Sequence, residues 1–211
     1  MDDIQAAIRD QYTRRALTYD DAVMHVELAD AVAQFLGSPN NLSVLDVATG
    51  TGLVLRAIRN HHPSIPVSMT GVDITPRMLE IARSHLPDVE FHEADAAALP
   101  LADASFDLAT CVCGLHLIPD TVSTVSEWAR VLRSGGRAVT ATYTYFDPDH
   151  YGPDAAASAE CQRGLPPDRH SRFDTVAKLA AVVEPAGFHR GRTEEWTHAG
   201  DVVVICEWIK D

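Results

Sequence analysis

The sequence predicts an α/β fold built on a doubly wound, mostly parallel sheet. Strand and helix patterns alternate from residue 42 to residue 183, and the strands are short, nearly continuous apolar runs, as in sheets that helices cover on both faces. The last two strand patterns, residues 188–196 and 201–209, flank His198-Ala199-Gly200 and predict a closing antiparallel hairpin. Seven strand patterns in 211 residues fit a single domain over residues 1–211.

The first predicted elements are helices, because apolar residues between 2 and 36 recur at intervals of three and four before Gly37-Ser38-Pro39. The strands expected after them span residues 42–47, 67–72, 89–92, 106–112 and 137–145. The helices expected between and after these strands span residues 53–59, 75–86, 121–133 and 175–183. Residues 146–172 are rich in Pro, Gly, Asp and Ala without a sustained period, which is typical of a lid, a binding loop or a short irregular helix.

Charge and composition exclude several classes of protein. The 17 basic and 30 acidic residues give a net charge of −13, which disfavours nucleic acid as the main partner. No apolar run approaches the roughly 18 residues of a membrane span, and the acidic start lacks the pattern of a signal peptide. We therefore expect a cytoplasmic protein. The spacings of cysteine and histidine match no metal-binding motif, so no metal is expected.

A turn of small residues after the first strand predicts a nucleotide site. In Val44-Leu45-Asp46-Val47-Ala48-Thr49-Gly50-Thr51-Gly52 the small residues allow close approach of the backbone to a ligand, beside a helix N-terminus. Asp73 ends the second strand, where nucleotide-binding α/β folds place the acid that accepts ribose hydroxyls. Asp95 follows the third strand, so three acids reach one edge of the sheet.

Other interpretations of these residues stay open. As structural residues, Asp73 would be a solvated acid at a strand end and Asp95 a helix cap. A dinucleotide dehydrogenase is disfavoured because the run of small residues ends at Gly52. The next residues are Leu53-Val54-Leu55, so the segment lacks the third small residue of G-x-G-x-x-G.

Four segments in order resemble class I, seven-stranded S-adenosylmethionine-dependent methyltransferases. They read VLDVATGTG, GVDITPRML, EADAAALPLADASFDLATCVCGLHLIPD and WARVLRSGGRAVT. The resemblance covers about residues 12–145 and points to the small-molecule group that includes quinone-biosynthesis C-methyltransferases. The family motif commonly has three glycines after the first acid, and Ala48 stands in place of the first one.

The resemblance implies a Rossmann-like fold, S-adenosyl-L-methionine as the cofactor, and in-line transfer of its methyl group to a small apolar or aromatic acceptor. It divides the domain into an N-terminal helical lid (1–36), a cofactor-binding core (42–145), an irregular acceptor-side segment (146–172), and a final helix and hairpin (173–211). A small molecule would be the partner, and the protein would be a monomer or a homodimer.

The resemblance also implies roles for individual residues. Asp46 would help hold the methionine amino group, Asp73 the ribose, and Asp95 with the Ala96 amide the adenine edge. Tyr12 and Tyr19 match an aromatic lid over the cofactor. Further cofactor-binding candidates are Ala48, Thr49, Gly50, Gly52, Ile74, Met78 and Cys111. Residues 111–113 alternate along a strand and would lie under the methionine part.

The transfer chemistry depends mainly on orientation, because the sulfonium leaves as a neutral thioether. A base is needed only where the acceptor must lose a proton. His116, just past the fourth strand, is the first candidate base. Tyr143 and Tyr145 lie two residues apart on the fifth strand and are expected to share a face of the acceptor pocket. Asp147 and His150 follow them.

Two other function classes stay open. A cofactor-binding protein of the same fold with different chemistry would carry the same motifs. A protein or RNA methyltransferase is disfavoured by the acidic charge. In addition, Cys111-Val112-Cys113-Gly114 stands where enzymes that methylate amides and base amines have Asn/Asp-Pro-Pro-Tyr.

Overall fold

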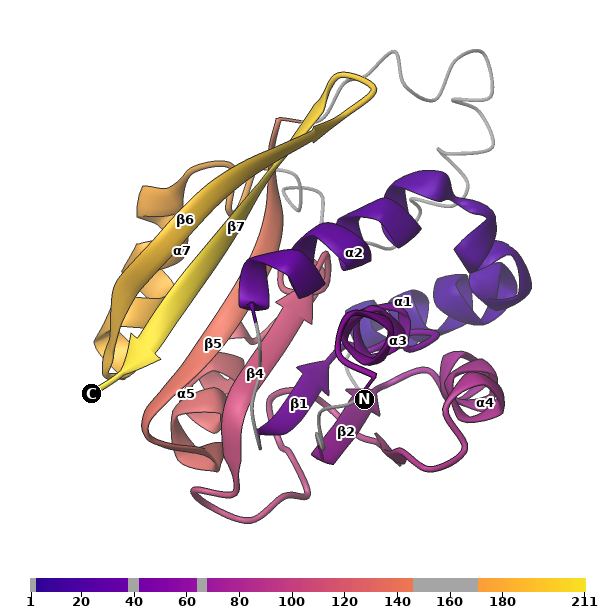
Figure 1. Cartoon of the computed structure of the whole chain (residues 1–211), viewed down its shortest axis with the longest axis horizontal. Coiled ribbons are helices and arrows are strands. Elements are labelled where there is room, and N and C mark those ends of the chain that lie inside the picture. The colour runs from indigo at the N-terminus through magenta and orange to yellow at the C-terminus, as the bar shows by residue number, and fades with distance from the viewer. Residues whose placement is uncertain (1–2, 38–41, 64–67, 146–170) are drawn as a thin grey trace.

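The computed structural model describes residues 3–37, 42–63, 68–145 and 171–211. They contain one seven-stranded sheet with the order β3-β2-β1-β4-β5-β7-β6. Its strands are β1 (Ser43–Val47), β2 (Ser68–Asp73), β3 (Glu90–Glu93), β4 (Phe106–Val112), β5 (Leu132–Tyr145), β6 (Phe188–His198) and β7 (Asp201–Lys210). The α/β class, the mostly parallel sheet and the antiparallel hairpin predicted from the sequence are confirmed (Figure 1).

The sheet reverses its strand order in the middle. β1 pairs in parallel with β2 on one side and with β4 on the other. The chain therefore winds away from β1 in both directions, and the carboxyl ends of β1 and β4 border a crevice where open α/β sheets bind ligands. β7 enters antiparallel between β5 and β6.

Helices cover both faces of the sheet. α2 (Val23–Leu36), α3 (Leu53–His61) and α4 (Pro76–His85) contribute to one core cluster, and α5 (Thr121–Val131) and α7 (Val176–Val183) to the other. Figure 1 shows α2 and α5 on opposite sides of the sheet. Within the described ranges, no helix has the length and apolar character that a membrane crossing needs.

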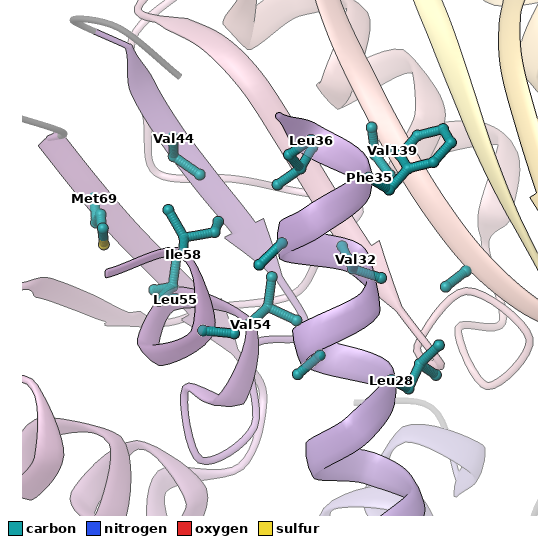
Figure 2. Close-up of a cluster of buried hydrophobic side chains, with 14 of the residues drawn as sticks. Leu28, Val32, Phe35, Leu36, Val44, Val54, Leu55, Ile58, Met69 and Val139 are labelled. Carbon is teal, nitrogen blue, oxygen red and sulfur yellow. The ribbon is translucent and has the colours of Figure 1, made fainter. Parts of the chain in front are cut away.

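The first cluster packs α2 and α3 against the sheet (Figure 2). Val32 of α2, Leu55 and Ile58 of α3, Val44 of β1 and Val139 of β5 are all 0% exposed. Burial of side chains of this size is worth roughly 1.5–3 kcal/mol each. The cluster therefore anchors both elements that flank the loop between β1 and α3.

The N-terminal segment divides into two parts. α1 (Asp3–Arg15) and the 3-10 helix η1 (Ala16–Asp21) reach across to the strand ends. Arg9 pairs with Glu93 at 2.7 Å, and the Asp20 carboxylate accepts from the Thr51 hydroxyl at 2.5 Å. In contrast, α2 is a core helix. The segment predicted as one lid over residues 1–36 therefore holds a covering part, 3–21, and a structural part.

One predicted boundary is wrong. The sequence predicted a helix through Arg133 with Gly135-Gly136 as its stop, but α5 ends at Val131 and β5 begins at Leu132. The register between β4 and β5 shifts here, so residues 133–136 form an irregularity inside the strand. A Cβ on Gly136 would lie 2.8 Å from the Arg133 carbonyl oxygen, which explains the glycine without a helix stop.

Candidate cofactor site

A cavity of about 760 Å³, here called the main cavity, lies at the carboxyl ends of β1, β2 and β4. It lies at the point where strand order reverses, which is where open α/β sheets bind ligands. The predicted site residues that line it are Tyr12, Tyr19, Ala48, Gly50, Asp73, Ile74, Met78, Asp95 and Ala96. The structure therefore brings most of the sequence candidates to one place.

The loop between β1 and α3 turns through left-handed backbone conformations. Ala48, Gly50 and Gly52 have φ angles of 58°, 55° and 80°, a region that costs residues with a Cβ roughly 1–2 kcal/mol. The Gly52 amide donates to the Thr49 carbonyl at 2.9 Å. Two of the three left-handed positions are glycines, so the turn carries this cost only at Ala48. Gly52 shapes the turn without lining the main cavity.

A further glycine, Gly114, was not predicted as a site residue. A Cβ on Gly114 would lie 2.7 Å from the Ala48 Cβ and 3.2 Å from the Cys111 sulfur. The loops that follow β1 and β4 therefore touch through these two small residues. A larger side chain at either position would separate the loops and open the floor of the main cavity.

Asp73 holds the first loop and faces the main cavity. Its two carboxylate oxygens accept from the backbone amides of Gly50 at 2.9 Å and Thr75 at 2.8 Å. Burial raises the pKa of Asp73, although these hydrogen bonds act in the opposite direction. Since each carboxylate oxygen has two lone pairs, Asp73 keeps acceptor capacity for a ligand. At 9% exposure it is not the solvated strand-end acid of the alternative interpretation.

Asp95 forms a turn after β3. Its carboxylate accepts from the Ala97 amide at 3.0 Å, two residues ahead, as in an Asx turn, and residues 94–101 contain no helix for it to cap. The carboxylate also accepts from the Gln5 side-chain amide of α1. Asp95 therefore ties the covering helix to the adenine end of the predicted site.

A second cavity of about 420 Å³, here called the smaller cavity, adjoins the main one. The two share the wall residues Tyr19, Ala48, Gly50, Val112 and Cys113. The smaller cavity is completed by residues of α2, β1, α3 and the loop between β1 and α3, among them His25, Asp46 and Thr49.

Asp46 is the buried acid of the smaller cavity, at 1% exposure. Its carboxylate accepts from the hydroxyls of Thr49 and Thr110, both at 2.7 Å. Burial raises the pKa of Asp46 to about 6, against the effect of these two hydroxyls. Neither hydroxyl carries a charge, so a cation in the cavity would stabilise the ionised carboxylate.

The prediction for Cys111 is wrong. β4 ends at Val112, and Cys113 has a left-handed φ of 51°, so the strand alternation stops before Cys113. Cys111 is buried in the cluster beneath α5, whereas Cys113 lines both cavities. Burial raises the pKa of Cys111, and it raises the pKa of Cys113 to about 12. Both are thiols at neutral pH, which disfavours a nucleophilic role.

The predicted acceptor residues come together only in part. The rings of His116 and Tyr143 meet edge to face with centroids 6.1 Å apart. Tyr145 is 55% exposed, and the register of β5 shifts between the two tyrosines, so the expected shared face is wrong. Within the described chain, His116 lines neither cavity. Asp147, His150 and residues 146–170 lie outside the described residues.

Arg172 braces the loop after β4. Its guanidinium donates to the carbonyls of Ile118 at 2.9 Å, His116 at 3.3 Å and Pro119 at 3.4 Å. Ile118 and Pro119 line the main cavity. Arg172 therefore fixes the backbone of one cavity wall and of the segment that carries His116.

Several lining residues were not predicted from the sequence. Gln5 and Ile8 line the main cavity from the same face of α1 as the predicted Tyr12. Their spacing of three and four from one another and from Tyr12 is the sequence signal that could have identified them. His25 gave no comparable signal, because Asp46 and Cys113, which line the same cavity, lie far from it in the sequence.

Comparisons with known proteins agree with this geometry. Residues 44–136 match the family model of a methyltransferase domain. A demethylmenaquinone methyltransferase of Chlorobaculum parvum is 33% identical over 145 residues, which cover 64% of this chain and 58% of the relative. A solved S-adenosylmethionine-dependent methyltransferase of Thermotoga maritima, described as a possible histamine N-methyltransferase, has a TM-score of 0.68 at 22% identity and covers 96% of this chain and 99% of its own. The [4+2]-cyclase SpnF has a TM-score of 0.66 at 19% identity and covers 88% of this chain and 81% of its own.

These likenesses differ in what they establish. The two solved structures bear on the fold alone. The chain spans about half the length of the curated relatives it matches, between 41% and 58% of the first three. The family model and the curated relatives confirm the resemblance carried by the four sequence motifs. In fold and in sequence, the chain resembles the class I S-adenosylmethionine-dependent methyltransferases, and among them the quinone C-methyltransferase group.

Proposed function

We propose that this chain is an S-adenosylmethionine-dependent methyltransferase whose acceptor is a small aromatic molecule of the quinol type. The observation that carries the proposal is the main cavity, where Asp73, Asp95 and the loop 48–52 meet beneath α1. The matching family model spans these strands. A curated relative named for a quinone precursor supports the acceptor class.

The lining residues fit this cofactor in charge. Its ribose hydroxyls and adenine amino group donate hydrogen bonds, and Asp73 and Asp95 supply acceptors. The described residues that line the main cavity include no Lys, Arg or His. Such a wall suits a cationic sulfonium and is poorly suited to the pyrophosphate of a dinucleotide.

The residues of the chain would act mainly by orientation. The bound cofactor supplies an electrophilic methyl group on a sulfur that leaves as a neutral thioether. α1 and η1 cover the cavity and exclude water, and the Gly114–Ala48 contact fixes the floor. Holding two reactants in line supplies on the order of 7–11 kcal/mol at best.

The acceptor side is proposed to lie at His116 and Tyr143. Methylation of a quinol ring carbon requires loss of a proton, and a histidine is the usual side chain to accept it. The edge-to-face contact of the two rings supports a shared location for these two side chains. The net charge of −13 supports a small uncharged acceptor over RNA.

A second candidate function rests on the likeness to the [4+2]-cyclase. That likeness concerns the fold, and it supports the hypothesis of a cofactor-binding protein with other chemistry. Both candidates require binding of the nucleoside, and only the first requires methyl transfer.

The test has two stages. Calorimetry with S-adenosylhomocysteine should show saturable binding, and methyl-labelled cofactor should label naphthoquinols kept reduced in the assay. His116→Ala should lower turnover by roughly 10²–10⁴ with little change in nucleoside affinity if the histidine is the base. Binding without transfer would favour the second candidate. Absence of binding would contradict both.

A further inference from the structure

The smaller cavity holds one titratable side chain, His25, to which neither the sequence resemblance nor the proposed function assigns a role. Asp46 lies at its β1 wall and His25 at its α2 wall. Tyr19 and Cys113 join them where the smaller cavity meets the main one. The rest of its side-chain wall is largely apolar and includes Leu28, Ala29, Leu53 and Val54.

The contacts of His25 determine which ring nitrogen carries hydrogen. Its Nδ1 lies 3.3 Å from the Tyr19 carbonyl oxygen, which only accepts, so Nδ1 carries the hydrogen. The His25 ring stacks on the Tyr19 ring with centroids 4.3 Å apart and planes 15° apart. These two contacts hold the ring in one orientation and leave Nε2 for a ligand.

The electrostatic surroundings keep His25 neutral. Burial lowers the pKa of His25, and Arg15 acts in the same direction, against the Tyr19 carbonyl and Asp20. At neutral pH, Nε2 therefore presents a lone pair. The smaller cavity thus combines a carboxylate with a neutral nitrogen acceptor, a pair that suits a ligand cation with several hydrogens, such as a primary ammonium group.

The cofactor of the proposed function carries such a group at the end opposite its adenine. Ala48, Gly50 and Cys113 border both cavities, so a molecule seated in the main cavity by Asp73 and Asp95 can extend past them. The proposed function, on which this inference rests, places the amino-acid end of the cofactor beside Asp46 in the smaller cavity. We propose that His25 Nε2 accepts a hydrogen bond from the ammonium group of that end. His25 is then a positioning residue that discriminates between nucleosides with and without this end.

Two nucleosides distinguish recognition of the amino-acid end by His25 from a general contribution of His25 to nucleoside binding. S-adenosylhomocysteine contains the amino-acid end, whereas 5′-methylthioadenosine keeps the adenosine and the thioether but lacks it. Calorimetry should show that His25→Ala weakens S-adenosylhomocysteine binding by roughly 10–100-fold, the range for a hydrogen bond to a charged group. The affinity for 5′-methylthioadenosine should stay within about threefold, below the effect of one lost neutral hydrogen bond.

Two conservative variants identify the nitrogen that matters. His25→Gln places an acceptor oxygen near the position of Nε2 and should restore most of the affinity. His25→Asn places its amide near Nδ1 and should bind like His25→Ala. His61→Ala is a matched control, because His61 pairs with Asp30 of α2 at 2.6 Å and lines neither cavity among the described residues. It should leave both affinities unchanged.

Three outcomes would overturn the inference while the proposed function stands. The first is an equal loss of affinity for both nucleosides in His25→Ala. The second is restored affinity in His25→Asn but not in His25→Gln. The third is full nucleoside affinity with lowered turnover in His25→Ala. If the wild-type chain binds neither nucleoside, the proposed function fails, and the inference fails with it.

Discussion

At the scale of single residues, one carboxylate serves both the fold and the site. Asp73 accepts from two backbone amides and faces the main cavity. Asp73→Ala removes both acceptors, and each unmade bond costs about 1–3 kcal/mol. We expect urea unfolding to show a loss of about 2 kcal/mol or more, and calorimetry on folded protein a loss of about 1.5–3 kcal/mol in S-adenosylhomocysteine binding. Asp88→Ala is the control, because Asp88 is an exposed acid paired with Arg59, and it should leave both quantities nearly unchanged. Unchanged affinity in Asp73→Ala would remove this residue from the site.

The second prediction at this scale concerns pH. The pKa of Asp46 is about 6 because of burial, and a ligand ammonium beside the carboxylate lowers it. A group whose pKa falls on binding favours the complex above its free pKa. S-adenosylhomocysteine affinity should therefore rise with pH up to about 6 and then level off.

The groups around the Asp46 carboxylate are His25, Tyr19, Cys113 and Asp73, and protonation of His25 changes the affinity in the same direction. Asp46→Asn should flatten the profile, and 5′-methylthioadenosine should show little pH dependence with either protein. A wild-type profile flat between pH 5 and 7 would contradict this assignment.

At the scale of elements, two arginines hold the C-terminus of α2 on the sheet. Arg192 donates to the Phe35 carbonyl at 2.6 Å and Arg137 to the Leu36 carbonyl at 3.1 Å, where the helix dipole favours cations. Glu207 accepts from Arg137 at 2.8 Å and from the Arg192 amide at 3.3 Å. Burial would raise the pKa of Glu207, but the arginines outweigh it and the pKa is lowered.

Removal of this carboxylate should loosen the end of α2. Because Arg137 is only partly buried and Arg192 is exposed, we expect Glu207→Gln to lower the unfolding free energy by about 1–3 kcal/mol, less than the 3–5 kcal/mol of a fully buried pair. Because the pKa of Glu207 is lower in the folded state, its ionised form stabilises the fold at pH values above the unfolded-state pKa of 4.5. The difference in unfolding free energy between the wild type and Glu207→Gln should therefore shrink as the pH falls below 4.5. Urea unfolding at two pH values measures both effects. Glu194→Gln, exposed on β6, is the control, and an equal loss in this control would contradict the role of Glu207.

The sequence predicted the presence of helices and strands better than the residues at which they begin and end. Alternating apolar runs and Gly or Pro signals located strands and helices, because burial and backbone geometry act locally. The boundary between α5 and β5 was wrong because Gly135-Gly136 serves an irregularity imposed by pairing with β4, a tertiary cause. The shift between Tyr143 and Tyr145 likewise arises from β7, so period-two reasoning failed there.

At the scale of the whole molecule, the site residues that the sequence predicted well are those at the ends of strands. Asp73 and Asp95 were predictable because the carboxyl ends of parallel strands meet at one edge. The pairing of Asp95 with Gln5 and the stacking of His25 on Tyr19 were not, since both depend on how the N-terminal segment folds back over the sheet. The position of His116 outside both cavities depends on the loop that Arg172 braces, which sequence spacing does not specify.

That covering segment gives a prediction for the molecule as a whole. α1 and η1 close the main cavity through Gln5, Ile8, Tyr12 and Tyr19, so a nucleoside in the cavity is enclosed between them and the sheet. Trypsin cleavage after Arg14 or Arg15 requires α1 to open, and a ligand that binds the closed form suppresses opening. At 100 times its Kd, a ligand stabilises the bound state by about 2.7 kcal/mol. We expect saturating S-adenosylhomocysteine to slow cleavage in α1 by at least about tenfold, with fragments identified by mass so that cuts beyond residue 145 are counted separately. At the same nucleoside concentration, Asp73→Ala should show clearly weaker protection, because its loss of about 1.5–3 kcal/mol raises the Kd roughly 10–150-fold. Equal cleavage rates in α1 of the wild-type chain with and without saturating nucleoside would show that residues 3–21 do not close over the cofactor.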